Sequence, residues 1–149
     1  MKTTIITSVF AVLVSTMNLS AKNVITYSNV ENNESGIKKE YVTINKETSK
    51  PESKGCYLYD RKGNITEKTI SVWNDGKGWV NTAKYEYQYT SANKISGLTY
   101  TEWNKETSNW ADKSSFIAHI YDENDELLSI EQINIQNMAN NDNNFITQK

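Results

Sequence analysis

Paired tryptophans and numerous tyrosines are the residues of this chain with the greatest chemical potential. The sequence contains 4 Trp and 9 Tyr, and Trp73 with Trp79 is followed about thirty residues later by Trp103 with Trp110. Both residue types offer flat, amphipathic surfaces that stack on sugars or dock a protein partner. The alternative is structural, because aromatic pairs across two strands stabilise a hairpin end by about 0.5–1.5 kcal/mol beyond burial.

Residues suited to catalysis are scarce. His119 is the only histidine, and no motif marks the nucleophile and orienting carboxylate that a catalytic histidine needs. We expect it to be an ordinary strand residue in the place that Tyr87 takes one repeat earlier. Cys56 is the only cysteine, which excludes an internal disulfide and a thiolate metal cluster. It is either a small buried side chain or a reactive or intermolecular thiol.

An acidic turn, Asp122–Glu126, invites comparison with a calcium loop, because alternating oxygen ligands suit that cation. The spacing fails, since the sixth position is Leu127 rather than Gly and the twelfth is Ile133 rather than Glu. We therefore expect a solvated hairpin tip. The sequence predicts no metal site, no cofactor and no catalytic residue.

The N-terminus has the pattern of a secretory signal peptide over residues 1–21. Lys2 precedes an apolar stretch, Ile5–Val14, and the small residues Ser20 and Ala21 suit cleavage. The apolar stretch is far shorter than the roughly 20 residues of a membrane-spanning helix. We expect no membrane span and export to the periplasm, the cell surface or the medium after cleavage near Ala21.

Charge and length restrict the possible partners of the remaining chain. Removal of residues 1–21 leaves 128 residues, a size that suits one domain. Only Lys2 is lost among the charged residues, so 15 basic and 18 acidic side chains remain. A mildly acidic chain lacks the basic surface of a nucleic-acid-binding protein.

An internal repeat organises the chain. Tyr59–Trp79 recurs as Tyr89–Trp110, and its opening returns at Tyr121. The segment Ile44–Ser49 matches Trp103–Ser108 at every position but the first. The hairpin before Tyr59 is therefore a degenerate copy with Ile44 in the place of a tryptophan.

The repeats predict short hairpins with defined turns. Asp60 to Gly63 fits a type I turn with Gly63 in the left-handed region, and Asp125 takes the place of Gly63 in the last copy. The spacing from Trp110 to Tyr121 implies an extra residue, hence a β-bulge between them.

Side-chain alternation along these hairpins predicts one aromatic face. Placing Tyr59 across from Ile65 and Trp73 across from Trp79 sets both Tyr57 and Tyr85 across from Glu67. Odd-numbered residues then share one face, which is the predicted binding surface. Its site residues are Trp73, Trp79, Trp103, Trp110, Tyr57, Tyr85 and Tyr87.

The predicted fold is a single all-β domain, an antiparallel meander of about seven strands built from hairpin repeats of about 30 residues, twisted or partly rolled. The β-repeat domain spans residues 38–135. Residues 22–37 are expected to be flexible with a possible short strand at Val24–Tyr27, and the Asn-rich residues 136–149 to be a disordered tail.

A signal peptide followed by tandem Tyr-Asp…Trp-Asn…Trp strands resembles a family of small secreted Bacteroidetes proteins of unknown function. The turn Tyr59–Ile65 also resembles the Tyr-Asp hairpin repeats of large bacterial surface and toxin-shell proteins. These resemblances imply an envelope or extracellular location and an antiparallel β repeat, and they supply no catalytic or ligand residue.

The leading hypothesis for function is an exported, non-catalytic binding module whose aromatic face takes a glycan or an envelope protein. The alternative is a structural envelope protein that associates with itself through its sheet edges or its Asn-rich tail. The sequence leaves the oligomeric state open.

Overall fold

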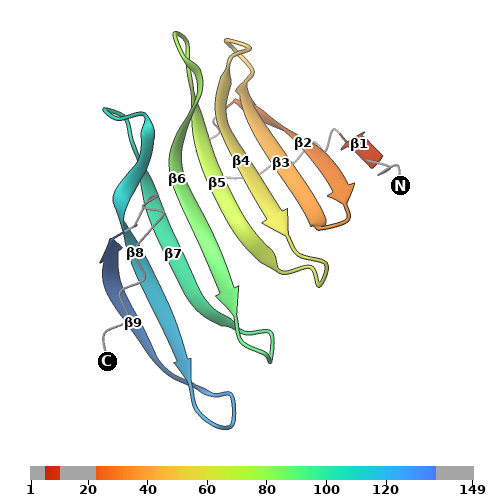
Figure 1. The fold of residues 1–149 in the computed structure, drawn as a ribbon. Helices are drawn as coiled ribbons and strands as arrows, with labels where there is room; N and C mark the ends of the chain where they lie inside the picture. Colours follow the sequence, from red (N-terminus) through yellow and green to blue (C-terminus); the bar gives the residue numbers. More distant parts are fainter. Residues whose placement is uncertain (1–5, 11–22, 137–149) are drawn as a thin grey trace.

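One antiparallel β-sheet makes up the described part of the chain. The computed structural model describes residues 6–10 and 23–136. All the regular secondary structure within these residues is β-strand (Figure 1). The strands are β1 (Ile6–Phe10), β2 (Val24–Asn33), β3 (Gly36–Asn45), β4 (Pro51–Tyr59), β5 (Ile65–Asn74), β6 (Gly78–Tyr89), β7 (Ile95–Asn104), β8 (Asn109–Tyr121) and β9 (Leu127–Gln136).

The strands pair in chain order from β1 to β9, and the sheet does not close on itself (Figure 1). Eight of them lie between Val24 and Gln136. The predicted single antiparallel meander is confirmed, with somewhat more strands than expected. The difference arises at the N-terminus, where the segment expected to be mostly flexible forms the ten-residue strand β2 paired along its length with β3.

Two predicted segments lie largely outside the described residues. Residues 137–149 of the predicted tail and residues 1–5 and 11–21 of the predicted signal peptide are outside the described part of the chain. Residues 6–10 form β1, which pairs with β2. Cleavage near Ala21 stays a prediction.

The sheet is a single layer with two open faces (Figure 1). Ala83 is the one buried hydrophobic side chain among the described residues, and no large side chain is fully buried. Stability therefore comes from the backbone ladder and from side chains that cover one another across strands. The buried polar residues are Ser71, Thr101 and Ser114.

The turns after β4, β6 and β8 share one construction. The first residue of each turn accepts backbone N–H groups with its side-chain oxygen, through Asp60, Thr90 and Asp122. The left-handed residues are Gly63 (φ 87°), Asn93 (φ 64°) and Asp125 (φ 62°). Asp125 thus takes the place of Gly63, as predicted, because Asn and Asp tolerate this conformation better than most residues.

Neighbouring turns at this end of the sheet are tied together. The amides of Asn64 and Asn93 bond each other reciprocally at 2.6 and 3.1 Å. Arg61 Nε donates to the carbonyl of Glu34, and Lys94 Nζ donates to that of Asp125. These contacts hold consecutive hairpins side by side.

The hairpins at the opposite end also repeat. An asparagine amide oxygen accepts two loop N–H groups in each of three copies, at Asn45, Asn74 and Asn104. Trp73 pairs with Trp79 and Trp103 with Trp110, and Ile44 with Pro51 holds the same place in the first copy. We call this the tryptophan end.

Bulges interrupt the strand pairing at several places. The predicted one is present, because Trp103 pairs with Trp110 and Thr101 with Ser114, which leaves residues 111–113 opposite Glu102. A bulge that the sequence did not predict lies at Thr82 in β6, between the pairs Ser71–Asn81 and Ile70–Ala83. Its hydroxyl donates to the carbonyl of Ile70 at 3.1 Å.

The prediction of one aromatic face is wrong. Tyr57 and Tyr85 pair with Lys68 rather than with Glu67, and Lys68 Nζ lies 5.6 and 5.3 Å from their ring centroids. Successive side chains of β5 alternate between the two faces of the sheet without interruption from Lys68 to Trp73. Because these two residues are an odd number of positions apart, five, their side chains point to opposite faces. Tyrosines therefore occupy one face and tryptophans the other, which we call the tyrosine face and the tryptophan face.

Candidate functional site

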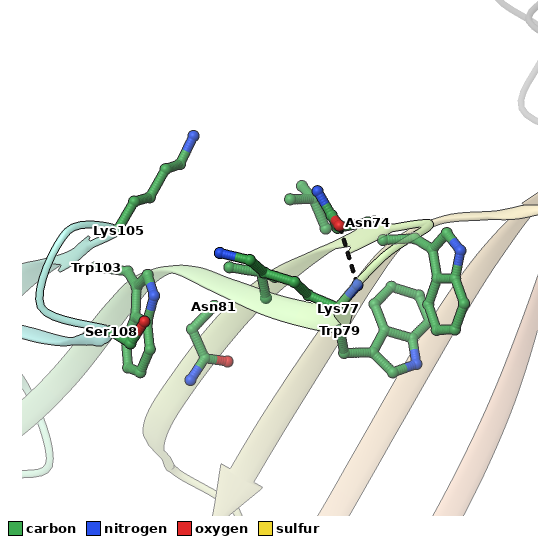
Figure 2. Close-up of a pocket in the computed structure, with 10 residues that line it drawn as sticks. Asn74, Lys77, Trp79, Asn81, Trp103, Lys105 and Ser108 are labelled. Atoms are coloured by element: carbon green, nitrogen blue, oxygen red, sulfur yellow. Dashed lines mark hydrogen bonds between the residues drawn. The ribbon is translucent and has the colours of Figure 1, made fainter.

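A cleft of about 340 Å³ opens between two hairpin tips at the tryptophan end (Figure 2). One tip joins β5 to β6 and the other joins β7 to β8. The cleft is lined by Val72, Trp73, Asn74, Lys77, Trp79, Val80, Asn81, Trp103, Lys105 and Ser108.

The cleft exists because β6 and β7 stop pairing before their tips. Their register runs from Tyr89–Ile95 to Ala83–Glu102. Residues 78–81 of β6 have described strand partners only on β5, and the bulged Thr82 has none on either strand. The two hairpins diverge beyond this point (Figure 1). One edge of β6 is thereby left open toward the cleft.

Aromatic contacts hold the indole rings in place. The ring centroids of Trp73 and Trp79 lie 5.3 Å apart at 77°, and those of Trp103 and Trp110 lie 5.0 Å apart at 87°. These are edge-to-face arrangements, which the aromatic quadrupole favours. Lys54 lies over Trp79 and Lys84 over Trp110, at 5.0 and 5.5 Å from the centroids.

Asp75 positions Trp73 from the loop. Trp73 Nε1 donates to one carboxylate oxygen at 3.2 Å, and Lys50 Nζ lies 2.6 Å from the other. The hydrogen bond and charge of Lys50 hold the pKa of the Asp75 carboxyl below its ordinary value. Because Lys50 follows β3, this ion pair also joins the tip of the β3–β4 hairpin to the tip of the β5–β6 hairpin.

Polar side chains complete the cleft. Asn81 Oδ1 accepts a bond from the hydroxyl of buried Ser71 at 2.9 Å, which fixes the amide on the tryptophan face. In Figure 2 this amide lies between Trp79 and Trp103. Lys77 and Lys105 are exposed at the opening, and the lining contains no carboxylate. The cleft therefore combines indole surface, the amides of Asn74 and Asn81, and two cations.

The structure separates the predicted site residues into two groups. Trp73, Trp79 and Trp103 line the cleft, and Trp110 packs on Trp103 outside its lining. Tyr57, Tyr85 and Tyr87 lie on the tyrosine face, where Tyr57 contacts Tyr41 and Tyr85 contacts Tyr100 at centroid distances of 5.5 and 5.1 Å.

Sequence reasoning missed the five polar residues of the cleft lining, which are Asn74, Lys77, Asn81, Lys105 and Ser108. The repeat alignment could have placed Lys105 beside the second tryptophan hairpin. It could not show that the two tips diverge, because that depends on where the pairing of β6 with β7 ends.

The remaining chemical candidates stay apart from the cleft. His119 pairs with Ile130 in the β8–β9 ladder. Burial raises the pKa of the half-buried Cys56 thiol, which disfavours the reactive thiolate. Within the described residues, no three His, Cys, Asp or Glu side chains are grouped so that they could hold a metal ion.

Comparison with known proteins identifies a family match. Residues 1–121 match a family described as "Family of unknown function (DUF3836)", a range that ends with the last residue of β8. The crystal structure of a DUF3836 family protein from Parabacteroides distasonis, at 1.50 Å resolution, shares 19% identity with this chain. The similarity covers 56% of this chain and 92% of that chain, with a TM-score of 0.31.

No curated protein matches the chain. In the part of the chain that the structure describes, no helix has the length and hydrophobicity to cross a membrane.

Proposed function

We propose that this chain, which belongs to the DUF3836 family of unknown function, is an exported, non-catalytic binding module that holds a glycan in the cleft between its two tryptophan hairpins. The proposal concerns the tryptophan end of the sheet. In this proposal the tyrosine face has a structural role and does not bind the glycan.

The observation that carries the proposal is the composition of the cleft. Three indole side chains and the amide of Asn81 line a space of about 340 Å³, within the range of about 300–1,000 Å³ of small-molecule sites. A sugar ring presents apolar C–H faces that stack on indole, and hydroxyl groups that bond to amides. The rings are held by neighbouring aromatic and lysine side chains, so little ordering is needed on binding.

A non-catalytic role agrees with the side chains present. A hydrolytic site for glycans uses a pair of carboxylic acids flanking the bond to be cut, and the cleft lining has none. Export is supported by the signal-like residues 1–21. A glycan outside the cytoplasm is the kind of ligand that such a protein meets.

Replacing Trp103 by alanine should weaken glycan binding about tenfold or more, since one stacking contact is worth about 0.5–1.5 kcal/mol beyond the apolar area it buries. Binding is measured by calorimetry with the best ligand from a glycan array. Trp110→Ala is the matched control, because it breaks the same indole pair but removes a ring that does not line the cleft.

Unfolding must be distinguished from loss of binding. Both variants lose the same edge-to-face contact, so their denaturation midpoints should fall by similar amounts while only Trp103→Ala loses affinity. Equal affinities for the two variants, or a blank array with folded protein, would count against a glycan site in this cleft.

A second candidate function, self-association in the cell envelope, is favoured by the edge strand β9. Its side chains Leu127, Leu128, Ile130 and Ile133 are 50%, 66%, 57% and 53% exposed. An exposed apolar edge strand offers free backbone groups for pairing with another strand.

Light scattering at high concentration should then show dimers or larger species. Ile133→Lys should shift the protein toward monomer, because a charge on an edge strand opposes pairing. Ile120→Lys, on the neighbouring strand β8 and 37% exposed, is the control that leaves the edge unchanged. A strict monomer at all concentrations would exclude this function.

A further inference from the structure

We infer that the ligand of the tryptophan cleft is an anionic saccharide, one whose carboxylate or sulfate group binds between Lys77 and Lys105. The inference rests on the proposed glycan-binding function and specifies the class of glycan. It comes from comparing two gaps between hairpin tips in the same sheet.

The first gap separates the β3–β4 tip from the β5–β6 tip, and an ion pair crosses it. Lys50 Nζ lies 2.6 Å from the Asp75 carboxylate. Lys50 directly precedes Pro51, which pairs with Ile44 as Trp79 pairs with Trp73. Asp75 is the second residue after Trp73. This gap is closed by side chains of opposite charge at defined positions of the repeat.

The second gap is the cleft, and the same positions cannot close it. The residue before the return tryptophan is Gly78, which has no side chain, and the second residue after Trp103 is Lys105. The cation Lys77 is next to Gly78 in the loop. Two cations therefore stand where the first gap has a cation and a carboxylate.

Neither cation forms an ion pair in the described part of the molecule. Four other lysines form ion pairs, with Glu31, Asp75, Glu40 and Glu86. Lys77 and Lys105 form none among the described residues, and both border the cleft. In Figure 2, Lys77 extends across the cleft toward the β7–β8 hairpin, and Lys105 projects from that hairpin.

An anionic group at the cleft opening satisfies both lysines. It would sit between two like charges that repel each other, and would form charge-assisted hydrogen bonds with their ammonium groups. The sugar ring that carries it would extend toward Asn81 and the indoles of Trp79 and Trp103. Carboxylate and sulfate satisfy the same chemistry.

A saccharide fits this cleft better than an acidic peptide does. A peptide would bind by adding a strand to the open edge of β6, which is only residues 78–82. The bulge at Thr82 disrupts the regular spacing of hydrogen-bonding groups within that short edge. Ring stacking and side-chain bonds do not depend on such a ladder.

Isothermal titration calorimetry with the folded protein tests the inference. The probes are a galacturonic acid oligosaccharide, its methyl-esterified form, which keeps the rings and removes the charge, and a chondroitin sulfate oligosaccharide. A panel of neutral oligosaccharides is measured beside them. We expect at least one charged probe to bind tenfold or more tightly than the ester and the neutral panel, with affinity falling as salt is raised.

Two charge reversals at equivalent repeat positions make the test specific. Lys105→Asp should weaken binding of the charged probe tenfold or more, because it places a carboxylate at the opening. Lys46→Asp is the matched control, since Lys46 follows Ile44-Asn45 as Lys105 follows Trp103-Asn104 and lies outside the cleft lining. Lys46→Asp should leave the affinity unchanged, and Lys105→Arg should retain it.

Each outcome separates the inference from the proposed function. Equal binding of the charged probe and its ester, or equal loss in both Asp variants, overturns the anionic ligand and leaves a glycan site intact. No binding of any saccharide to folded protein overturns both. Binding of a poly-glutamate peptide alone, weakened by Lys105→Asp, overturns both in favour of an acidic peptide.

Discussion

Replacing Gly36 by alanine should lower the free energy of unfolding by at least about 3 kcal/mol. Gly36 begins β3 with φ 150°, and a Cβ atom there would lie 1.9 Å from the backbone carbonyl oxygen of Tyr59. Backbone cannot move aside as the end of a side chain can. The β2–β3 turn would have to leave β4, breaking the Ile37–Tyr59 pairing. Urea denaturation followed by tryptophan fluorescence measures the loss.

Gly63→Asn is the control for the Gly36 experiment. Gly63 also has positive φ, 87°, but a Cβ atom there would meet nothing within 4 Å. Asn93 already adopts φ 64° at the equivalent turn position, so asparagine should cost less than about 1 kcal/mol. If both variants were equally stable, close approach of the β2–β3 turn to Tyr59 would be disproved.

Deleting Thr82 should leave Trp79 paired with Trp73. Thr82 is the extra residue of the β6 bulge, and without it β6 can pair with β5 in continuous alternation. Asn81 would then directly precede Ala83, and both residues would keep their present partners and their opposite faces. Trp79 therefore stays on the tryptophan face and keeps its contacts with Trp73 and Lys54. The expected loss is about 0.5–1.5 kcal/mol of stability, because the hydrogen bond from the Thr82 hydroxyl to the Ile70 carbonyl is removed.

Near-ultraviolet and far-ultraviolet circular dichroism can test this expectation, because two indoles in edge contact give a coupled signal. The measurement is made in a Trp103→Phe background, which leaves the pair Trp73–Trp79 as the one indole pair in contact. The signal should persist on deletion of Thr82 and in the control Thr82→Ser, which keeps a hydroxyl for the Ile70 carbonyl. Loss of the signal on deletion would show that Thr82 is a regular residue of the ladder, because removing such a residue turns Trp79 to the other face.

Much of this fold was predictable from local sequence. Turn residues such as Asp60, Gly63 and Asp125 specify their own backbone conformations through short-range hydrogen bonds and tolerance of positive φ. The pairing of Trp73 with Trp79 follows from the length of one hairpin loop. The sequential antiparallel order follows because short turns join strands that are adjacent.

Part of the candidate site was also predictable. Trp73, Trp79 and Trp103 line the cleft, and all three belong to the predicted set. Tyr57, Tyr85 and Tyr87 were assigned to the same surface and lie on the opposite one. A prediction of faces from side-chain alternation assumes that every residue of the strand is paired in register. One unrecognised bulge therefore assigns every residue beyond it to the wrong face of the sheet.

The sequence by itself determined the all-β class, the repeat, the turns and the two tryptophan pairs, because each depends on residues close together in the chain. Tertiary structure alone decided which face the tryptophans occupy and which gap between hairpin tips stays open. The first depends on one-residue bulges formed against facing strands, at Thr66 in β5, Thr82 in β6 and Ser96 in β7. The second depends on side chains from different hairpins: Lys50 meets Asp75 across one gap, and Lys77 and Lys105 border the other without a carboxylate.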